Sequence, residues 1–254
     1  MNKLKYLVLM LSSGMVFIAC TPNQSNKDEN NVNQGKQAVS EYDMNHLEVD
    51  SDYRHAPDAA YEAWMDRRFG MRIHWGIYSQ LGLDASWPTL NASNEFKEIY
   101  NTLWQIFNPV AFDAEEWAQL AEDAGMKYFV FTTKHCDGFS MFDTKTMVNV
   151  KMRKPVGKVS GIGNVIDTTL HYSIMETQFK RDIVKEITDA FRARNMGIGF
   201  YYSNTDWYDI NHRFEKKHMQ YDPAYTLESD PEGYRKAIER QTQQLLELCT
   251  NYGK

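Results

Sequence analysis

The sequence contains little cysteine and no cluster of basic residues. Its three cysteines in 254 residues are too few for a disulfide framework, and Cys136 and Cys249 lack the spacing of a zinc site. Lysine and arginine number 28 against 34 aspartate and glutamate residues, for a net charge of -6. An acidic chain without a basic stripe does not have the composition of a nucleic-acid-binding protein. The sequence therefore predicts no nucleic-acid partner, and its cysteines predict no metal site.

A hydrophobic run long enough to span a bilayer is also missing. The longest apolar stretch, residues 6–18, is shorter than the roughly 20 residues that a membrane helix needs. Two lysines precede it and Ala19-Cys20 ends it, which is typical of a bacterial lipoprotein signal. We therefore expect residues 1–19 to be a signal peptide and Cys20 to carry lipid. Phe17 stands where leucine is commoner, so ordinary signal cleavage and an uncleaved anchor stay open.

The expected product is an exported bacterial membrane lipoprotein, in the periplasm or at the cell surface. Residues 20–57 consist largely of polar and charged side chains, which cannot bury enough apolar surface to form a core. We interpret them as a disordered tether. The folded part is expected to span residues 58–254, beginning with a helix that Asp58 caps.

Aromatic residues, by contrast, are abundant, at 13% of the chain. Apolar runs with strand character occur at residues 70–75, 128–132 and 198–202. Amphipathic helices are predicted at residues 113–124, 182–195 and 231–252. Asp113 is expected to cap the first, whose inward face is Trp117, Leu120, Ala121 and Ala124. The second is expected to point Ile183, Val184, Ile187, Ala190 and Phe191 inward. The apolar stripe of the third is Tyr234, Ile238, Leu245, Cys249 and Tyr252. Alternating strands and helices with short turns predict an α/β protein built on a parallel sheet. Because no strand follows the last helix, one long sheet edge would stay bare, so we expect the first part of a larger α/β barrel.

Two connections between these elements are long. Residues 76–110 are rich in aromatics and exceed an ordinary strand-to-helix turn. We expect them to form a packed cap, part of a ligand wall, or both. Residues 143–177 are expected to form an irregular loop.

Each predicted strand ends in polar and aromatic side chains. The carboxyl ends of parallel strands meet at one rim, where binding groups collect. Imidazole and phenol groups can donate and accept hydrogen bonds, and indole rings offer flat apolar faces. A sugar needs both, because its hydroxyls require directional partners and its C–H groups pack on a ring. The first candidates are His74, His135, Tyr201 and Trp87, and the second are Trp75, Cys136 and Trp207.

Structural roles remain alternatives for these residues. A histidine at a strand end can be a hydrogen-bonded structural residue, a tyrosine can belong to a barrel core, and Cys136 can be a small buried apolar residue. A metal bound jointly by His135 and Cys136 is disfavoured, because adjacent strand residues point to opposite faces.

Three ordered motifs resemble a known family. They are RFGMRIHWGIYS at residues 68–79, TKHCDGF at 133–139, and GFYYS at 199–203 with Asp206-Trp207 close behind. Over residues 58–254 the chain resembles the N-terminal half of the α-L-fucosidase catalytic domain, glycoside hydrolase family 29. The resemblance implies a (β/α)8 TIM-like barrel, incomplete here, with only its first strands and helices present.

The resemblance also implies an activity and its residues. The family hydrolyses terminal α-linked L-fucose from glycans with retention of configuration and without a cofactor. By motif, His74 and His135 would hydrogen-bond fucose hydroxyls, Tyr201 would lie beside the reacting end, and Trp87 would line the pocket. The family commonly has histidine at the position of Cys136 and glutamate at the position of Ser86, which leaves affinity and substrate choice open.

The catalytic carboxyl groups of the family have no counterpart in the sequence. Retaining hydrolysis needs a nucleophile and an acid about 5 Å apart, and the resemblance places both beyond Lys254. Asp137, Asp206 and Asp209 are the carboxylates nearest the predicted rim, and the resemblance makes Asp137 structural. We therefore expect the 254-residue chain alone to be inactive.

Two further functions stay open from the sequence. One is a non-catalytic glycan-binding lipoprotein that keeps the aromatic platform. The other is a glycosidase of a related barrel family that acts on another sugar.

Overall fold

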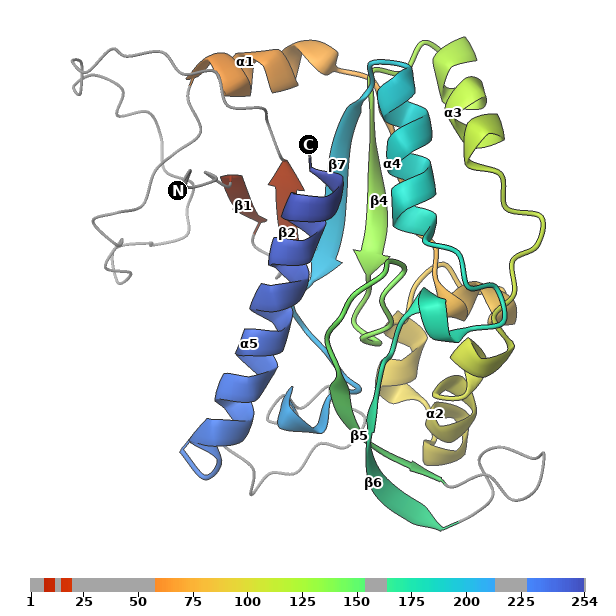
Figure 1. The fold of residues 1–254 in the computed structure, drawn as a ribbon, viewed down its shortest axis with the longest axis vertical. Helices are drawn as coiled ribbons and strands as arrows, with labels where there is room; N and C mark the ends of the chain where they lie inside the picture. Colours follow the sequence, from red (N-terminus) through yellow and green to blue (C-terminus); the bar gives the residue numbers. More distant parts are fainter. Residues whose placement is uncertain (1–6, 12–14, 20–57, 154–163, 213–227, 254) are drawn as a thin grey trace.

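The computed structural model describes residues 7–11, 15–19, 58–153, 164–212 and 228–253 (Figure 1). The predicted lipidation site Cys20 and the predicted tether, residues 20–57, lie outside these ranges.

Three parallel strands form the centre of the structure: β3 (Gly70–Ile73), β4 (Tyr128–Lys134) and β7 (Gly197–Ser203). β4 lies between the other two, and Tyr128 pairs with both Gly70 and Gly197. Because the three strands start level and run in one direction, their carboxyl ends reach the same rim of the sheet (Figure 1). The predicted α/β architecture with these parallel strands is confirmed.

The segment predicted to be an export signal adds two strands to this sheet. β1 (Leu7–Leu11) and β2 (Met15–Ala19) form an antiparallel pair, and β2 pairs with β7, giving the order β1-β2-β7-β4-β3. The prediction of a bare sheet edge is therefore wrong for β7. The physical reason is that the unpaired N–H and C=O groups of an open sheet edge can form backbone hydrogen bonds with any segment that extends beside them.

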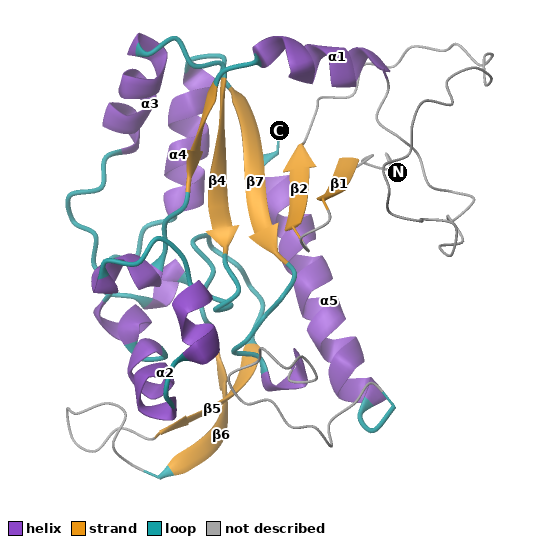
Figure 2. Cartoon of the chain, turned by 180° about the vertical axis from the view of Figure 1, so that it is seen from behind, coloured by secondary structure: helices purple, strands orange, loops and turns teal. Residues whose placement is uncertain are grey.

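Helices cover one face of the sheet. In Figure 1, α4 (Ile183–Ala193) and α5 (Pro231–Glu247) lie in front of the strands with α3 (Ala114–Asp123) beside them, and in Figure 2 the strands lie in front. None of the helices in the described ranges is both long and apolar enough to cross a bilayer.

Helix α4 follows its sequence pattern closely. The backbone N–H of Lys185 donates to the capping carboxylate of Asp182 over 3.0 Å, which satisfies one of the free amides of the first turn. Phe191 packs against Phe129 of β4 with ring centroids 4.1 Å apart. The residues predicted to point inward are all buried: Ile183, Val184, Ile187, Ala190 and Phe191.

Helices α3 and α5 follow their patterns only in part. Asp113 caps α3 as predicted, accepting from the amides of Glu115 and Glu116. Leu120, predicted to face inward, is 66% exposed, because α3 meets α4 through its small alanines. Ile238 of α5 is 39% exposed, contrary to prediction. The buried residues of α5 are largely polar instead: Arg240, Gln241, Gln244 and Glu247, beside Gly233 and Ala237. A π-helical turn, Leu248–Tyr252, follows it.

The two ends of the sheet differ. Helix α1 (Asp58–Arg67) lies at the amino ends of the strands, as Figure 1 shows. At the carboxyl ends lie α2 (Asn94–Tyr100) and three short 3₁₀ turns, Ile77–Leu81, Trp87–Asn91 and Leu103–Ile106. Tyr100, Leu103 and Phe107 are buried there. The connection 76–110 is therefore packed, as predicted.

The predicted irregular loop 143–177 contains a two-stranded ribbon instead. Strands β5 (Val148–Arg153) and β6 (Val165–Leu170) pair antiparallel and extend from the rim (Figure 2). The sequence carried the signal, because apolar residues alternate with polar ones in β5, as in a strand with one buried face. Two more 3₁₀ turns, Ile174–Glu176 and Ile210–His212, lie farther along the chain.

Candidate functional site

Five rings meet at the carboxyl rim of the parallel strands, and we call them the ring cluster: His74, Trp87, His135, Tyr201 and Trp207. The His74 ring centroid lies 4.8 Å from that of His135 and 5.0 Å from that of Tyr201. Trp87 lies 5.7 Å from His135 and 5.5 Å from Trp207. The four first candidates and one of the second are thus brought together.

Strand register explains this convergence. Thr132 of β4 pairs with Tyr201 of β7, and Phe131 pairs with Ile73 of β3. His74 directly follows Ile73, so it reaches the level of Tyr201. His135 follows the end of β4 and stacks nearly parallel on Tyr201, with 12° between the planes.

Each histidine of the ring cluster is bonded through Nδ1 to a hydroxyl group. His74 Nδ1 lies 2.5 Å from Thr132 Oγ1, and His135 Nδ1 contacts Ser86 Oγ. Nε2 of His135 is buried and has no hydrogen-bond partner among the described residues. A buried nitrogen in that state costs free energy unless another group pairs with it, so it is suited to meet a ligand.

Both imidazoles are held in the neutral form. Burial, with the positive charge of Arg72 as a second cause, lowers the pKa of His74 to about 4. Burial also lowers the pKa of His135 to about 3, with further lowering from His74 and Lys134. At neutral pH the pair therefore offers hydrogen bonds without charge, which fits an uncharged ligand.

Two residues near the ring cluster were missed at the sequence level. Arg72 lies two residues before His74 on β3, so both side chains point to one face, and its Cζ is 5.0 Å from the Tyr201 ring centroid. The Tyr78 ring lies 5.7 Å from that of His135. Its hydroxyl is buried with no hydrogen-bond partner among the described residues. The period-2 pattern of strands was the signal for Arg72, and none existed for Tyr78.

The two tryptophans of the ring cluster differ in exposure. Trp87 is 41% exposed, whereas Trp207 is fully buried. The backbone N–H of Trp207 donates to the carbonyl of Cys136 over 2.7 Å, which ties this residue to the end of β4. The Nε1 atom of Trp207 is buried without a partner in the described ranges.

Trp75 and Cys136 do not join the ring cluster. Trp75 packs against Phe107, Phe112 and Trp117, at centroid distances of 5.3 to 5.9 Å, because adjacent residues at a strand end point to opposite faces. Cys136 Sγ lies 3.0 Å from Ser203 Oγ. Burial raises the pKa of this thiol to about 11, so it stays protonated.

A buried ion cluster of Lys134, Asp206, Asp209 and Arg240 adjoins Trp207, which follows Asp206 in the chain. All four side chains are at least nine-tenths buried. Arg240 contacts the Asp206 carboxylate and donates from Nε to Asp209 over 2.9 Å. Lys134 Nζ lies 3.4 Å from Asp206. The positive charges of Lys134 and Arg240 hold the pKa of Asp206 well below its usual range, although burial acts against them.

The carboxylate of Asp137 is also engaged. It accepts a hydrogen bond from the Tyr100 hydroxyl over 2.5 Å and one from the backbone N–H of Phe139 over 3.1 Å. Burial nevertheless raises its pKa to about 6. Asp84 is exposed, and its charge acts on His74 and Tyr78.

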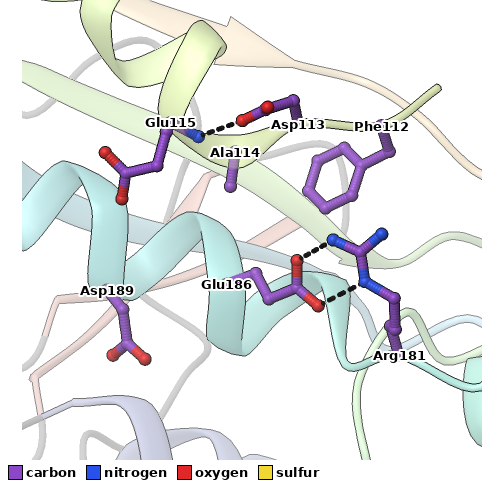
Figure 3. Close-up of a pocket in the computed structure, with 7 residues that line it drawn as sticks. All are labelled: Phe112, Asp113, Ala114, Glu115, Arg181, Glu186 and Asp189. Atoms are coloured by element: carbon purple, nitrogen blue, oxygen red, sulfur yellow. Dashed lines mark hydrogen bonds and ion pairs between the residues drawn. The ribbon is translucent and has the colours of Figure 1, made fainter.

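A separate surface hollow of about 460 Å³ lies between α3 and α4 (Figure 3). Its acidic lining includes Glu115 and Asp189, and Arg181 is paired with Glu186 on the α4 side. None of the sequence-predicted site residues lines it.

Within the described ranges, no group of three or more His, Cys, Asp or Glu side chains is placed to bind a metal.

Known proteins resemble this chain in sequence and fold. The family model described as alpha-L-fucosidase matches residues 32–161 and 164–254. Human tissue alpha-L-fucosidase is 29% identical over 170 residues, which are 61% of this chain and 32% of that protein. The chain thus spans about a third of the length of the curated relatives it matches.

Solved structures give the same result. Alpha-L-fucosidase isoenzyme 1 from Paenibacillus thiaminolyticus aligns with a TM-score of 0.55 at 30% identity, covering 76% of this chain and 40% of that one. Alpha-L-fucosidase AlfC from Lactobacillus casei, solved in complex with its α-L-fucose product, aligns with a TM-score of 0.54 at 28% identity, covering 76% and 57%. With a family model matched over most of its length, this chain belongs to the alpha-L-fucosidase family.

Proposed function

We propose that the ring cluster binds the terminal α-linked L-fucose of a glycan, as part of the active site of a retaining α-L-fucosidase. The observation that carries this proposal is the convergence of His74, His135 and Tyr201 from three strand ends. Neutral imidazoles pair with sugar hydroxyls, and the ring of Trp87, which is 41% exposed, offers a face for its C–H groups. Binding of a neutral sugar by these groups needs no metal ion and no redox group, so we expect the site to work without a cofactor.

The fold suits the same proposal. Strands β3, β4 and β7 would be the first strands of a (β/α)8 barrel, with α3, α4 and α5 on its outside. Support comes from the aligned fucosidase structures, of which this chain covers 40% in the Paenibacillus case. The ring cluster then lies at the carboxyl end of the barrel strands, where barrel enzymes place their active sites.

We propose that the 254-residue chain by itself binds fucose and does not cleave it. Retaining hydrolysis uses two carboxyl groups about 5 to 5.5 Å apart. The Asp137 carboxylate accepts a hydrogen bond from Tyr100, and the carboxylates of Asp206 and Asp209 form ion pairs with Arg240. A glycan-binding lipoprotein is therefore the second candidate, favoured by these engaged carboxylates.

Thermal unfolding tests the binding proposal. Fucose should raise the unfolding temperature of the chain, and galactose should raise it less, because a ligand stabilises only the state that it binds. His135→Gln should abolish the shift, whereas His171→Gln, in a histidine outside the ring cluster, should preserve it. Equal shifts with both sugars would indicate a related glycosidase with another substrate.

Hydrolysis separates the enzyme from the binder. We expect no release of 4-nitrophenol from 4-nitrophenyl α-L-fucoside by the purified chain under conditions where fucose protects it. Release that His135→Gln abolishes would contradict the proposed inactivity and identify a complete active site.

We also propose that the protein is exported and anchored through lipid on Cys20. Support comes from the sequence Ala19-Cys20 after a short apolar stretch. Labelled palmitate should be incorporated by the chain expressed in a bacterium, and Cys20→Ser should prevent incorporation. Labelling of the Cys20→Ser variant would contradict this assignment.

A further inference from the structure

Each of the two histidines in the ring cluster forms a hydrogen-bonded pair with a hydroxyl group, and the two pairs have the same arrangement. Thr132 Oγ1 meets Nδ1 of His74, and Ser86 Oγ meets Nδ1 of His135. Both hydroxyls are almost fully buried, at 1% and 0% exposure. In both pairs the hydroxyl holds Nδ1 and leaves Nε2 as the nitrogen available to a ligand.

We infer that Ser86 and Thr132 are positioning residues that fix both histidines in the tautomer with the proton on Nε2, so that the site presents two N–H donors to its ligand. This inference rests on the proposed function only for the identity of that ligand, a neutral sugar.

The number of protons in each pair favours this tautomer. A serine or threonine hydroxyl carries one proton, and a neutral imidazole carries one proton on either nitrogen. Among the described residues, neither Ser86 Oγ nor Thr132 Oγ1 has a hydrogen-bond partner besides its histidine. If Nδ1 carried the proton, the hydroxyl proton would point at no acceptor in a buried site.

The opposite arrangement pairs the hydroxyl proton with Nδ1 and leaves only the Nε2–H of the ring for a ligand, since Nε2 of His135 has no partner among the described residues. The hydroxyl donates to a bare Nδ1, and the imidazole proton lies on Nε2. Since the bond at one ring nitrogen decides the tautomer at the other, the two hydroxyls dictate what the ligand meets. The low pKa values of both histidines keep a second proton off the rings at neutral pH.

The consequence is a requirement on the ligand. It must offer two accepting oxygens, one to each Nε2–H, and its hydroxyl protons must go to other acceptors. A sugar hydroxyl meets this requirement, because its oxygen accepts while its proton donates elsewhere.

Nitrogen NMR of the ligand-free chain tests the tautomers directly. In the ¹⁵N-histidine-labelled full chain at pH 7, His74 and His135 should each show a protonated Nε2 and a bare Nδ1. His74→Gln and His135→Gln assign the signals by their loss. A protonated Nδ1 in either wild-type ring overturns the inference for that ring, whether or not fucose binds.

Substitution of the hydroxyls tests their positioning role. Ser86→Ala should give a mixture of tautomers at His135 alone and weaken fucose binding by about three- to tenfold, the usual effect of one hydrogen bond. Ser86→Thr keeps a hydroxyl and should restore the single tautomer. A single Nε2–H tautomer in folded Ser86→Ala would overturn the role of Ser86.

A matched control and a separate outcome complete the design. Thr89→Val removes a buried hydroxyl from the same turn, one that donates to the backbone carbonyl of Ser86, and should leave both tautomers unchanged. A tautomer change in that variant would assign the effect to the turn and overturn the role of the Ser86 hydroxyl. If the wild type shows both Nε2–H forms but fucose does not protect the chain, the proposed function fails and the inference stands.

Discussion

His135 is buried and His74 is half-buried, both as neutral imidazoles, and this burial makes the free energy of unfolding depend on pH. Burial lowers the pKa of His135 from 6.5 to about 3, so between these values the unfolded chain binds a proton that the native chain does not. Stability from this group is therefore present above pH 6.5 and is lost as the pH falls toward 3.

The first prediction follows from that sign. In denaturant titrations between pH 7 and 4, the wild type should lose stability as the pH falls, with His135 contributing at most about 1.4 kcal/mol per pH unit. His135→Gln should lower the slope. An unchanged slope in that variant would show that His135 takes up its proton equally in both states.

The buried ion cluster gives the second prediction at this scale. Arg240→Gln leaves Asp206 and Asp209 as buried charges without their main partner, which typically costs about 3 to 5 kcal/mol of unfolding free energy. Arg235→Gln is the matched control on the same helix, because its ion pairs with Glu232 and Glu239 are exposed, and it should cost far less. Chemical denaturation measures both, and equal losses would contradict a special role for the cluster.

At the scale of elements, the turn after β4 joins the ring cluster to the ion cluster. Gly138 has a φ of +79°, a region that side chains disfavour. A Cβ built on it would lie 2.5 Å from Asp206 Oδ1. The turn therefore needs glycine both for its backbone and for the space that the Asp206 carboxylate occupies.

The third prediction separates these two needs. Gly82 also has a positive φ, +69°, but no atom lies within 4 Å of its ideal Cβ. Gly82→Ala should cost about 1 to 2 kcal/mol from the backbone alone, and Gly138→Ala should cost clearly more. Gly138→Ala should also change the fluorescence of the buried Trp207, whereas Gly82→Ala should not. Equal costs would show that Asp206 moves aside freely.

At the scale of the whole molecule, the β1–β2 hairpin covers the outer edge of β7. If the chain is processed before Cys20, as we propose, both strands are removed and that edge loses its partner. An unpaired strand edge is a site for association with other chains.

The fourth prediction compares the full chain with a chain that begins at Cys20. Amides within residues 197–203 should exchange with solvent faster in the shorter chain, because residues 200–203 lose the β2 partner. Residues 128–134, in the central strand β4, should keep their protection. Equal exchange of residues 197–203 in both chains, measured by mass spectrometry, would contradict the pairing of β2 with β7.

Local sequence patterns specify the helices and strands and the level at which the strands end. Apolar runs closed by polar side chains marked β3, β4 and β7, and the five apolar positions of α4 marked its buried face, because strand and helix periodicity are local properties. The same runs indicated His74, His135 and Tyr201 as neighbours at one rim.

Contacts between distant segments have no local signal and depend on how those segments pack. Ser86 meets His135 across 49 positions, and Arg240 meets Asp206 across 34. Leu120 and Ile238 became exposed because the neighbour of a helix, and not its own periodicity, selects the face that is buried. The sequence thus specified which side chains reach the rim, and packing between distant segments specified their partners and protonation.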